Sequence, residues 1–285
     1  MCRHPFACVS VRRRYARYLV WLRTLIVAFA AAICAQTAGA APEPVLRIIF
    51  PEGSSVRQMA DQAAHVRRIA IAKRNVTPLL SGEGYAAAAA RATPPRAFRV
   101  FLKLRNIEGF LFPAGYEFLP SSTPASLIAR QIATFEQRWR TLDLRRARGR
   151  GRTPYDVLKI ASLVEREAAI AAERVLIAAV ISNRLNRGMP LAIDASLRYG
   201  LGVEGTRPLT AAHLRSSSPY NTHRFKGLPP TPITNPGLPS MRAAANPAAV
   251  GHLYYLRRPN SLRHFFTASE AEFCEKALEY GYEGC

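Results

Sequence analysis

Acidic residues are scarce in this sequence of 285 residues, in which 19 Asp and Glu stand against 40 Lys and Arg. The resulting net charge of +21 suits nucleic acid, but it equally suits a surface that works beside anionic lipids or anionic wall polymers. No RRM, KH, zinc-finger or helix-turn-helix pattern is present, and the arginine runs are not interleaved with aromatic residues. We therefore expect no nucleic-acid partner.

Cysteine is also rare, with five residues in the whole sequence. Only Cys274 and Cys285 lie outside the N-terminal segment, so one C-terminal disulfide remains open. The sequence has no CxxC pair and no cluster of His and Cys residues with the spacing of metal ligands. We expect neither a metal site nor a cofactor.

The N-terminal segment, residues 1–41, begins with several arginines and no acidic residue, and then becomes apolar from Tyr18. Positive charge before an apolar run predicts a cytoplasmic N-terminus and export of the rest of the chain. The small residues 38–40 resemble a cleavage site, so a cleaved signal peptide competes with a retained transmembrane anchor. We favour a single-pass anchor in the inner membrane.

Residues 42–152 predict a small α/β module and a connecting segment. A short strand begins near Val45, and a Pro-Glu-Gly turn and a helix capped by Ser54 or Ser55 follow. Residues 98–104 are a candidate strand, and 121–139 have the cap and apolar spacing of a helix. A basic linker then ends this module.

The stretch 155–188 organises the rest of the chain, because its apolar residues recur at the three- and four-residue spacing of a helix with one buried face. Glu165 and Glu167 fall on opposite margins of that face. Small alanines border Glu165 and leave room for a ligand, whereas Glu167 has Arg174 two turns further on. The two glutamates should therefore have different roles.

A long proline-rich loop, 216–247, follows, and it is long enough to form one wall of a site. Two candidate strands, 253–256 and 264–266, and a helix from Ser269 complete the chain. The sequence thus predicts an α+β protein with a larger mixed helix and strand domain, 153–285, that contains a cleft.

Five blocks of this sequence resemble, in order and spacing, the YceG-like family of bacterial endolytic murein transglycosylases. They are IASLVEREA, VISNRLNRGMPL, IDASLRYG, SPYNTHRFKGLPPTPITNPGLPSMRAAANPA and LYYLRRPNSLRHFFTAS. FPEGSSVRQMA and EGFLFPAGYEF resemble the smaller module of the family, which is LysM-like. The resemblance implies a single-pass inner-membrane protein whose extracytoplasmic domain cuts nascent peptidoglycan glycan strands in mid-chain, leaves 1,6-anhydro-MurNAc ends and works near peptidoglycan synthases.

The resemblance also assigns the catalytic acid, because Glu165 matches the essential glutamate of the family. One such group suffices, since the C6 hydroxyl of the sugar attacks C1 and no water is activated. Candidate sugar-binding residues are Asp194, Ser196, Tyr199, Tyr220, Asn221 and Thr222, although each is equally suited to shaping its loop. Ala192 stands where the family usually has a glutamine.

Two other functions remain open. Glu165 and Asp194 could be the carboxylate pair of a hydrolase that acts on the same polymer. A non-catalytic scaffold that binds peptidoglycan is the alternative from a different class. If Glu165 is the acid, Glu165→Gln should lose activity, whereas Glu167→Gln should retain most of it unless Glu167 holds Arg174 in place.

Overall fold

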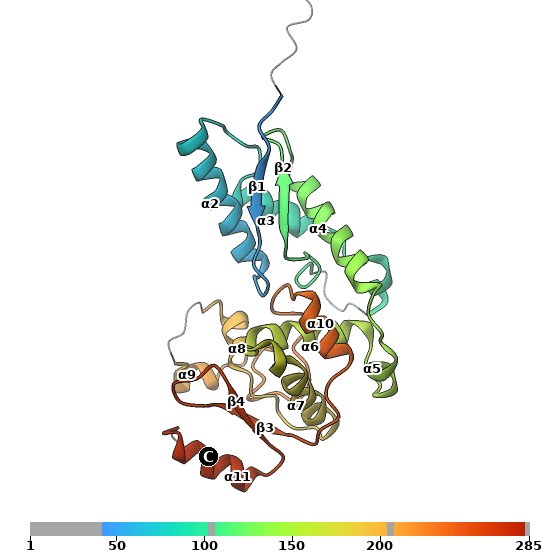
Figure 1. Ribbon diagram of the computed structural model, residues 1–285, viewed down its shortest axis with the longest axis vertical. Coiled ribbons are helices and arrows are strands. Elements are labelled where there is room, and N and C mark those ends of the chain that lie inside the picture. Colours follow the sequence, from blue (N-terminus) through green and yellow to red (C-terminus); the bar gives the residue numbers. More distant parts are fainter. Residues whose placement is uncertain (1–41, 102–105, 204–207, 283–285) are drawn as a thin grey trace, which may run out of the picture. The chain divides into compact units, whose positions relative to one another are not determined.

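The computed structural model describes residues 42–101, 106–203 and 208–282 (Figure 1). Residues 1–41, which carry the predicted anchor or signal segment, lie outside them. In the described ranges no helix has the length and apolar character needed to cross a membrane. Val45–Cys285 forms one compact unit, and the division into modules at residue 152 stays a prediction.

The N-terminal part of this unit combines a two-stranded antiparallel sheet with helices. Its elements are β1 (Leu46–Ile49), α2 (Val56–Arg74), α3 (Gly82–Arg91), the 3₁₀ helix η1 (Arg96–Phe101), β2 (Gly115–Phe118), α4 (Pro124–Trp139) and α5 (Arg145–Gly149).

The C-terminal part is mainly helical and carries a second two-stranded antiparallel sheet. Its elements are α6 (Pro154–Glu167), η2 (Ala171–Glu173), α7 (Arg174–Asn186), α8 (Asp194–Leu201), α9 (Ala211–Leu214), α10 (Leu238–Ala245), β3 (Tyr254–Arg257), β4 (His264–Thr267) and α11 (Glu270–Glu279). Cys274 on α11 is disulfide-bonded, and Cys285 lies outside the described residues.

The first strand, turn and helix form as the sequence predicts. Leu46 pairs with Phe118 across β1 and β2, and alternate residues of both strands are buried. Ser55 caps α2 by accepting a hydrogen bond from the backbone of Gln58, whose side chain bonds back to the cap. This capping box satisfies two backbone donors that the first helical turn leaves unpaired.

The predicted strand at 98–104 is wrong over its described part, because Arg96–Phe101 is a 3₁₀ helix. Phe98 is buried and meets Phe110 and Trp139 in edge-to-face contacts, with ring centroids 5.0 and 4.9 Å apart. The segment has strand propensity, but it pairs with no strand among the described residues. Burial of Phe98 in the aromatic cluster therefore determines its conformation.

The prediction of one helix over 155–188 is also wrong. Helix α6 ends at Glu167 because Ala168 adopts an extended conformation, with φ −83° and ψ 103°, and α7 begins only at Arg174. No proline or glycine enforces this break. Contacts made by the two ends override helix propensity instead: Glu167 accepts a hydrogen bond from Tyr255, and Glu173 accepts two from His264.

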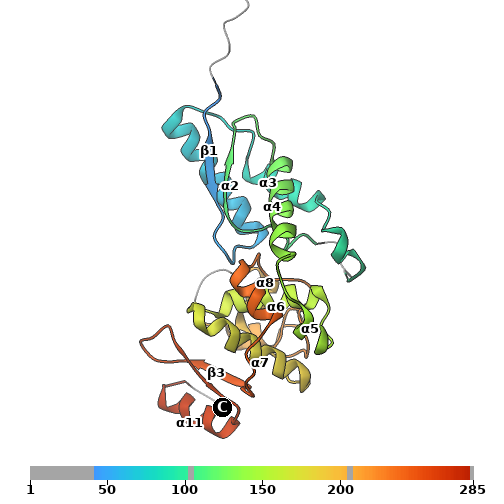
Figure 2. The same ribbon diagram turned by 45° about the vertical axis from the view of Figure 1, so that its right-hand side comes forward.

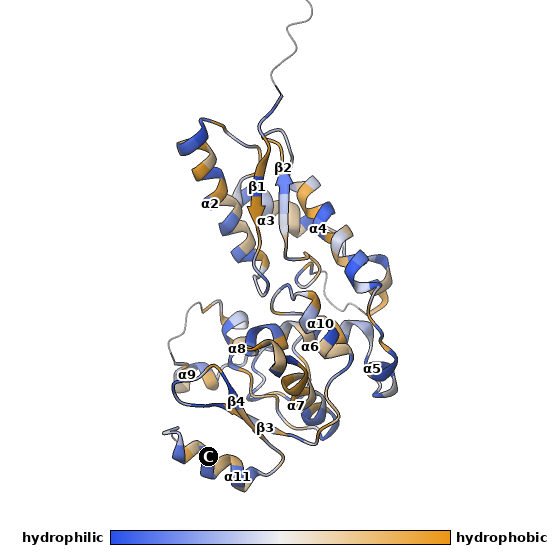
Figure 3. Cartoon of the chain, viewed as in Figure 1, coloured by the Kyte–Doolittle hydropathy of each residue, from blue (hydrophilic) through white to orange (hydrophobic). Residues whose placement is uncertain are grey.

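Helix α6 packs against α10 and α7, and Figures 1 and 2 both show α6 beside α10. Figure 3 shows hydrophobic ribbon along β1 and α7, whereas α5 is strongly hydrophilic. The buried face of α6 contains Val157, Ile160, Ala161 and Val164, as the three- and four-residue spacing predicts. The sequence therefore identified the packed face correctly, although not the length of the helix.

Asn235, in the loop before α10, joins three segments that are distant in sequence. Its backbone exchanges hydrogen bonds with the first turn, from Gly53 N to its carbonyl and from its own N to the carbonyl of Ser54, both at 3.0 Å. Its side-chain oxygen accepts the backbone N–H groups of Gly109 and Leu111, both at 2.9 Å. The turn after β1 is therefore fixed against the loop that leads into α10.

Candidate active site

Glu165 lies on α6 with its side chain 5% exposed. Its Oε2 accepts the backbone N–H of Gly237 at 2.8 Å, and its Oε1 lies 3.5 Å from Nη2 of Arg174. Gly237 is the N-cap of α10, so the carboxylate sits at the positive end of that helix. Both partners stabilise a negative charge on Glu165, and Arg174 contacts this residue rather than Glu167.

Glu52, in the turn after β1, lies beside the same position. A Cβ atom on Gly237 would clash with the carboxylate of Glu52, so glycine allows the two to approach closely. Burial raises the pKa of Glu52, the charge of Glu165 raises it further, and Arg174 opposes both. The turn, Glu165 and Arg174 thus form one electrostatic cluster.

Glu167, the last residue of α6, has different surroundings. Its Oε2 accepts a hydrogen bond of 2.8 Å from the hydroxyl of Tyr255 on β3. Burial raises the pKa of Glu167, and the negative charge of Asp194 raises it further, while Tyr255, His264 and Arg166 act in the opposite direction. Burial, together with Glu167, also raises the pKa of Tyr255 well above its ordinary value. Glu167 therefore keeps its proton to a higher pH than an ordinary glutamate.

Asp194 is the first residue of α8, and its negative charge lies close enough to Glu167 to raise the pKa of Glu167. Its Oδ1 lies 2.9 Å from Nε2 of His223, and this hydrogen bond lowers the pKa of Asp194 despite partial burial. Asp194 is therefore the ionised member of the pair with Glu167. The structure brings this predicted residue to Glu167 rather than to Glu165.

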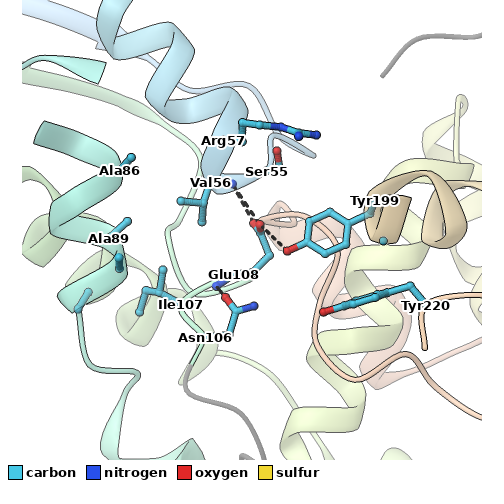
Figure 4. Close-up of a pocket in the computed structure, with 13 residues that line it drawn as sticks. Ser55, Val56, Arg57, Ala86, Ala89, Asn106, Ile107, Glu108, Tyr199 and Tyr220 are labelled. Carbon is cyan, nitrogen blue, oxygen red and sulfur yellow. Dashed lines mark hydrogen bonds between the residues drawn. The ribbon is translucent and has the colours of Figure 1, made fainter. Parts of the chain in front are cut away.

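Another predicted pair, Tyr199 and Tyr220, lines a separate cavity of about 470 Å³ (Figure 4). Their rings meet edge to face, with centroids 5.2 Å apart. The opposite wall comes from alanines of α3, including Ala86 and Ala89, which Figure 4 shows across the cavity from Tyr199. The cavity has one apolar wall and one wall rich in hydroxyl groups.

Glu108 also lines this cavity, and sequence reasoning missed it. Its side chain accepts the backbone N–H of Val56 at 3.1 and 3.2 Å and the hydroxyl of Tyr199 at 3.1 Å (Figure 4). It also accepts the amide of Asn235 at 2.8 Å. Burial raises its pKa to about 7, although these hydrogen bonds and Arg57 oppose the increase. The only signal in the sequence was an acidic residue placed before an apolar, aromatic run.

The remaining predicted residues, Ser196, Asn221 and Thr222, are buried and hold the backbone. Ser196 donates to the carbonyl of Tyr220 at 2.8 Å, and Thr222 accepts the N–H of Ile193 at 2.9 Å. Asn221 donates to two carbonyls in the preceding turn. Their polar groups therefore shape the loop that carries Tyr220 and His223.

Among the described residues, no group of three or more His, Cys, Asp or Glu side chains could hold a metal ion. Helices with two small sheets define an α+β protein whose site consists of carboxyl, hydroxyl and imidazole groups. The chain belongs to the YceG-like family, which matches residues 28–279.

Proteins named endolytic murein transglycosylase are among its relatives. One from Bacillus subtilis (strain 168) is 33% identical over 218 residues, which cover 75% of this chain and 59% of the relative. One from Streptococcus pneumoniae (strain ATCC BAA-255 / R6) is 31% identical over 179 residues, which cover 61% of this chain and 32% of the relative. This chain therefore spans between about a third and three fifths of the length of these relatives.

A solved structure has the same fold. The crystal structure of a YceG-like protein from Listeria monocytogenes aligns with a TM-score of 0.62 at 28% identity. The alignment covers 83% of this chain and 76% of that protein. It confirms the mixed α and β architecture that the sequence predicts.

Proposed function

We propose that this protein is an endolytic peptidoglycan transglycosylase, a lyase that cuts MurNAc–GlcNAc bonds within glycan strands and leaves 1,6-anhydro-MurNAc ends. Membership of the YceG-like family and the names of its relatives support this function. The observation that carries it is Glu167, a carboxyl group whose pKa is raised by burial and which lies between Tyr255 and the charge of Asp194.

The reaction needs one group that acts first as an acid and then as a base. Glu167 donates its proton to the bridging oxygen while the bond from C1 to that oxygen breaks and its electron pair moves to the oxygen. The ionised Asp194 stabilises the positive charge that develops at C1. The C6 hydroxyl of the same sugar then attacks C1, and its proton passes to Glu167, which restores the starting state.

The geometry favours Glu167 over Glu165 for this role. A general acid must be protonated at the start, and burial raises the pKa of Glu167. Both carboxylate oxygens of Glu165 already have partners, Arg174 and the backbone N–H of Gly237. We infer that Glu165 instead holds Arg174 beside the start of α10. The family resemblance predicts Glu165 as the catalytic acid instead. One experiment distinguishes the two assignments.

That experiment measures anhydro-ended fragments by mass spectrometry after the purified full chain acts on uncrosslinked glycan strands. Glu167→Gln should lower the rate by about 10²–10⁴-fold, the usual contribution of a positioned acid–base group. The matched variant Glu165→Gln should retain activity but unfold at a lower temperature, because it weakens the contact with Arg174. Loss of activity in Glu165→Gln alone, with both variants folded, would reverse the assignment.

Sugar binding fits the cavity beside Tyr199 and Tyr220, because pyranose rings have apolar faces and hydroxyl edges. Ala86 lines the cavity and is exposed on α3, so Ala86→Trp should fill the cavity and raise KM without affecting folding. Ala87→Trp is the control, since Ala87 is an exposed neighbour that does not line the cavity. Equal KM values in both variants would exclude this subsite.

A hydrolase of the same polymer is the second candidate, and the interaction of Asp194 with Glu167 favours it specifically. In a hydrolase, Asp194 would activate a water molecule, and the products would carry reducing ends instead of anhydro ends. The same mass spectra distinguish the two reactions.

A single-pass inner-membrane location, with the catalytic unit on the extracytoplasmic side, is also part of the proposal. The arginines and apolar run of residues 1–41 support it, and nascent strands beside membrane-bound synthases would be the substrate. We further propose that residues 42–152 are LysM-like. Fractionation tests the location: a soluble mature protein beginning near Ala41 would indicate a cleaved signal peptide instead.

A further inference from the structure

A buried carboxylate–imidazole contact, between Glu173 and His264, lies beside Tyr255. Glu173, at the end of η2, accepts the backbone N–H of His264 at 3.0 Å with Oε1 and the ring Nδ1–H at 2.7 Å with Oε2. The side chains of both residues are 9% exposed. Two bonds to one carboxylate fix both the orientation of the imidazole ring and the nitrogen that carries its proton.

The ring of His264 is directed at Tyr255. The two residues lie on the same face of the sheet of β3 and β4, because Arg257 pairs with His264 and Tyr255 lies two residues before Arg257. Their rings meet at 86° with centroids 5.5 Å apart. Tyr255 in turn donates to Glu167 at 2.8 Å, so a continuous set of contacts joins Glu173 to Glu167.

Glu167 needs opposite stabilisation at different stages of the proposed reaction. It must be neutral before the first proton transfer and negatively charged between the two transfers. Burial and Asp194 favour the neutral form, whereas Tyr255 and His264 favour the charged form, together with Arg166 on the same helix. The groups that favour the charged form are needed because a carboxyl group releases its proton only if the resulting carboxylate is stabilised.

We propose that His264, oriented by Glu173, is a positioning residue that acts through Tyr255 to stabilise the carboxylate of Glu167 between the two proton transfers. This inference rests on the proposed function. His264 takes part in no proton transfer: the proton that leaves Glu167 goes to the leaving oxygen, and the proton that returns comes from the C6 hydroxyl.

The test is His264→Asn, because the asparagine amide can still donate to Glu173 but lacks the imidazole ring that meets Tyr255. We expect kcat to fall by roughly 10- to 100-fold, the effect of removing an electrostatic partner near the reacting group at an intermediate dielectric. KM should not change. The alkaline limb of the profile of kcat against pH should move to higher pH, because Glu167 loses a group that lowers its pKa. Glu173→Gln should have a smaller effect in the same direction.

The matched control is His252→Asn, since the ring of His252 packs on Phe266, with centroids 6.0 Å apart, and is not among the groups that shift the pKa of Glu167. It should leave kcat and the pH profile unchanged. A fall in kcat for His264→Asn with an unshifted profile would mean a purely structural role and would overturn the proposal. If His264→Asn does not fold, by circular dichroism, the profile of Glu173→Gln decides by the same criterion.

The proposed function fails separately from this inference. If the wild-type chain releases no fragments, or if Glu167→Gln is fully active, the proposed function is wrong. If wild type is active, Glu167→Gln is inactive, and His264→Asn matches wild type in rate and profile, only the role of His264 is refuted.

Discussion

Glu108 should make the stability of this protein depend on pH near neutrality. Its side chain is 2% exposed, and its pKa is raised from 4.5 to about 7 with burial as the largest cause. Between these two pH values the folded chain binds a proton that the unfolded chain has released. The contribution of Glu108 to stability is therefore complete below pH 4.5 and is lost as the pH rises through about 7.

The size of this effect follows from the difference between the two pKa values. A difference of about 2.5 units, at about 1.4 kcal/mol per unit, corresponds to about 3 kcal/mol in the free energy of unfolding. That is a large share of the total stability of an ordinary domain, which is about 5–15 kcal/mol. Hydrogen bonds from Val56, Asn235 and Tyr199 already moderate the shift.

The assay is chemical denaturation of wild type and Glu108→Gln between pH 4.5 and 8. Glutamine cannot titrate, so the variant loses the pH-dependent contribution of residue 108 to the free energy of unfolding. Its amide will also face a donor such as the Val56 N–H, which adds a constant penalty at every pH. The difference between the two curves should change by about 3 kcal/mol across this range, in favour of wild type at low pH. Parallel curves, or a change of opposite sign, would refute the assignment of a raised pKa to Glu108.

Three further substitutions should change stability in the same denaturation assay. Thr153→Ala removes the cap of α6 and should cost about 1 kcal/mol, so an unchanged midpoint would show that the cap contributes nothing. Asn235→Ala leaves the N–H groups of Gly109 and Leu111 without their acceptor and should cost about 3 kcal/mol; a loss below 1 kcal/mol would mean that water replaces the amide. Ala192 has φ 53°, a left-handed conformation that glycine adopts without strain, so Ala192→Gly should stabilise by about 0.5–1 kcal/mol, and any loss of stability would contradict this reasoning.

Local sequence signals predicted much of the fold because they act over one or two turns. Ser55, Thr153 and Ser269 each cap the helix that follows, through a bond to a backbone N–H three residues later. The strands near 253–256 and 264–266 also formed close to their predicted limits. Local signals failed where distant contacts compete, as at the break after Glu167 and at Phe98.

The candidate site was predicted less completely, because the same residue type can bind sugar or hold the backbone. Tyr199 and Tyr220 line the cavity. Asp194 has a pKa that is lowered by its hydrogen bond with His223. The side chains of Asn221 and Thr222 instead form hydrogen bonds with the backbone. Nothing in the sequence separates these outcomes, since each depends on which atoms lie beside the side chain after folding.

The sequence by itself determined the family, the helix caps and the apolar faces, because these reside in short patterns of neighbouring residues. Only the tertiary structure decided the surroundings of two glutamates that lie two positions apart. Glu165 meets Gly237 and Arg174, whereas Glu167 meets Tyr255, which follows it by 88 residues. The protonation of a carboxyl group depends on burial and on charges within a few ångströms, and folding alone brings those groups together.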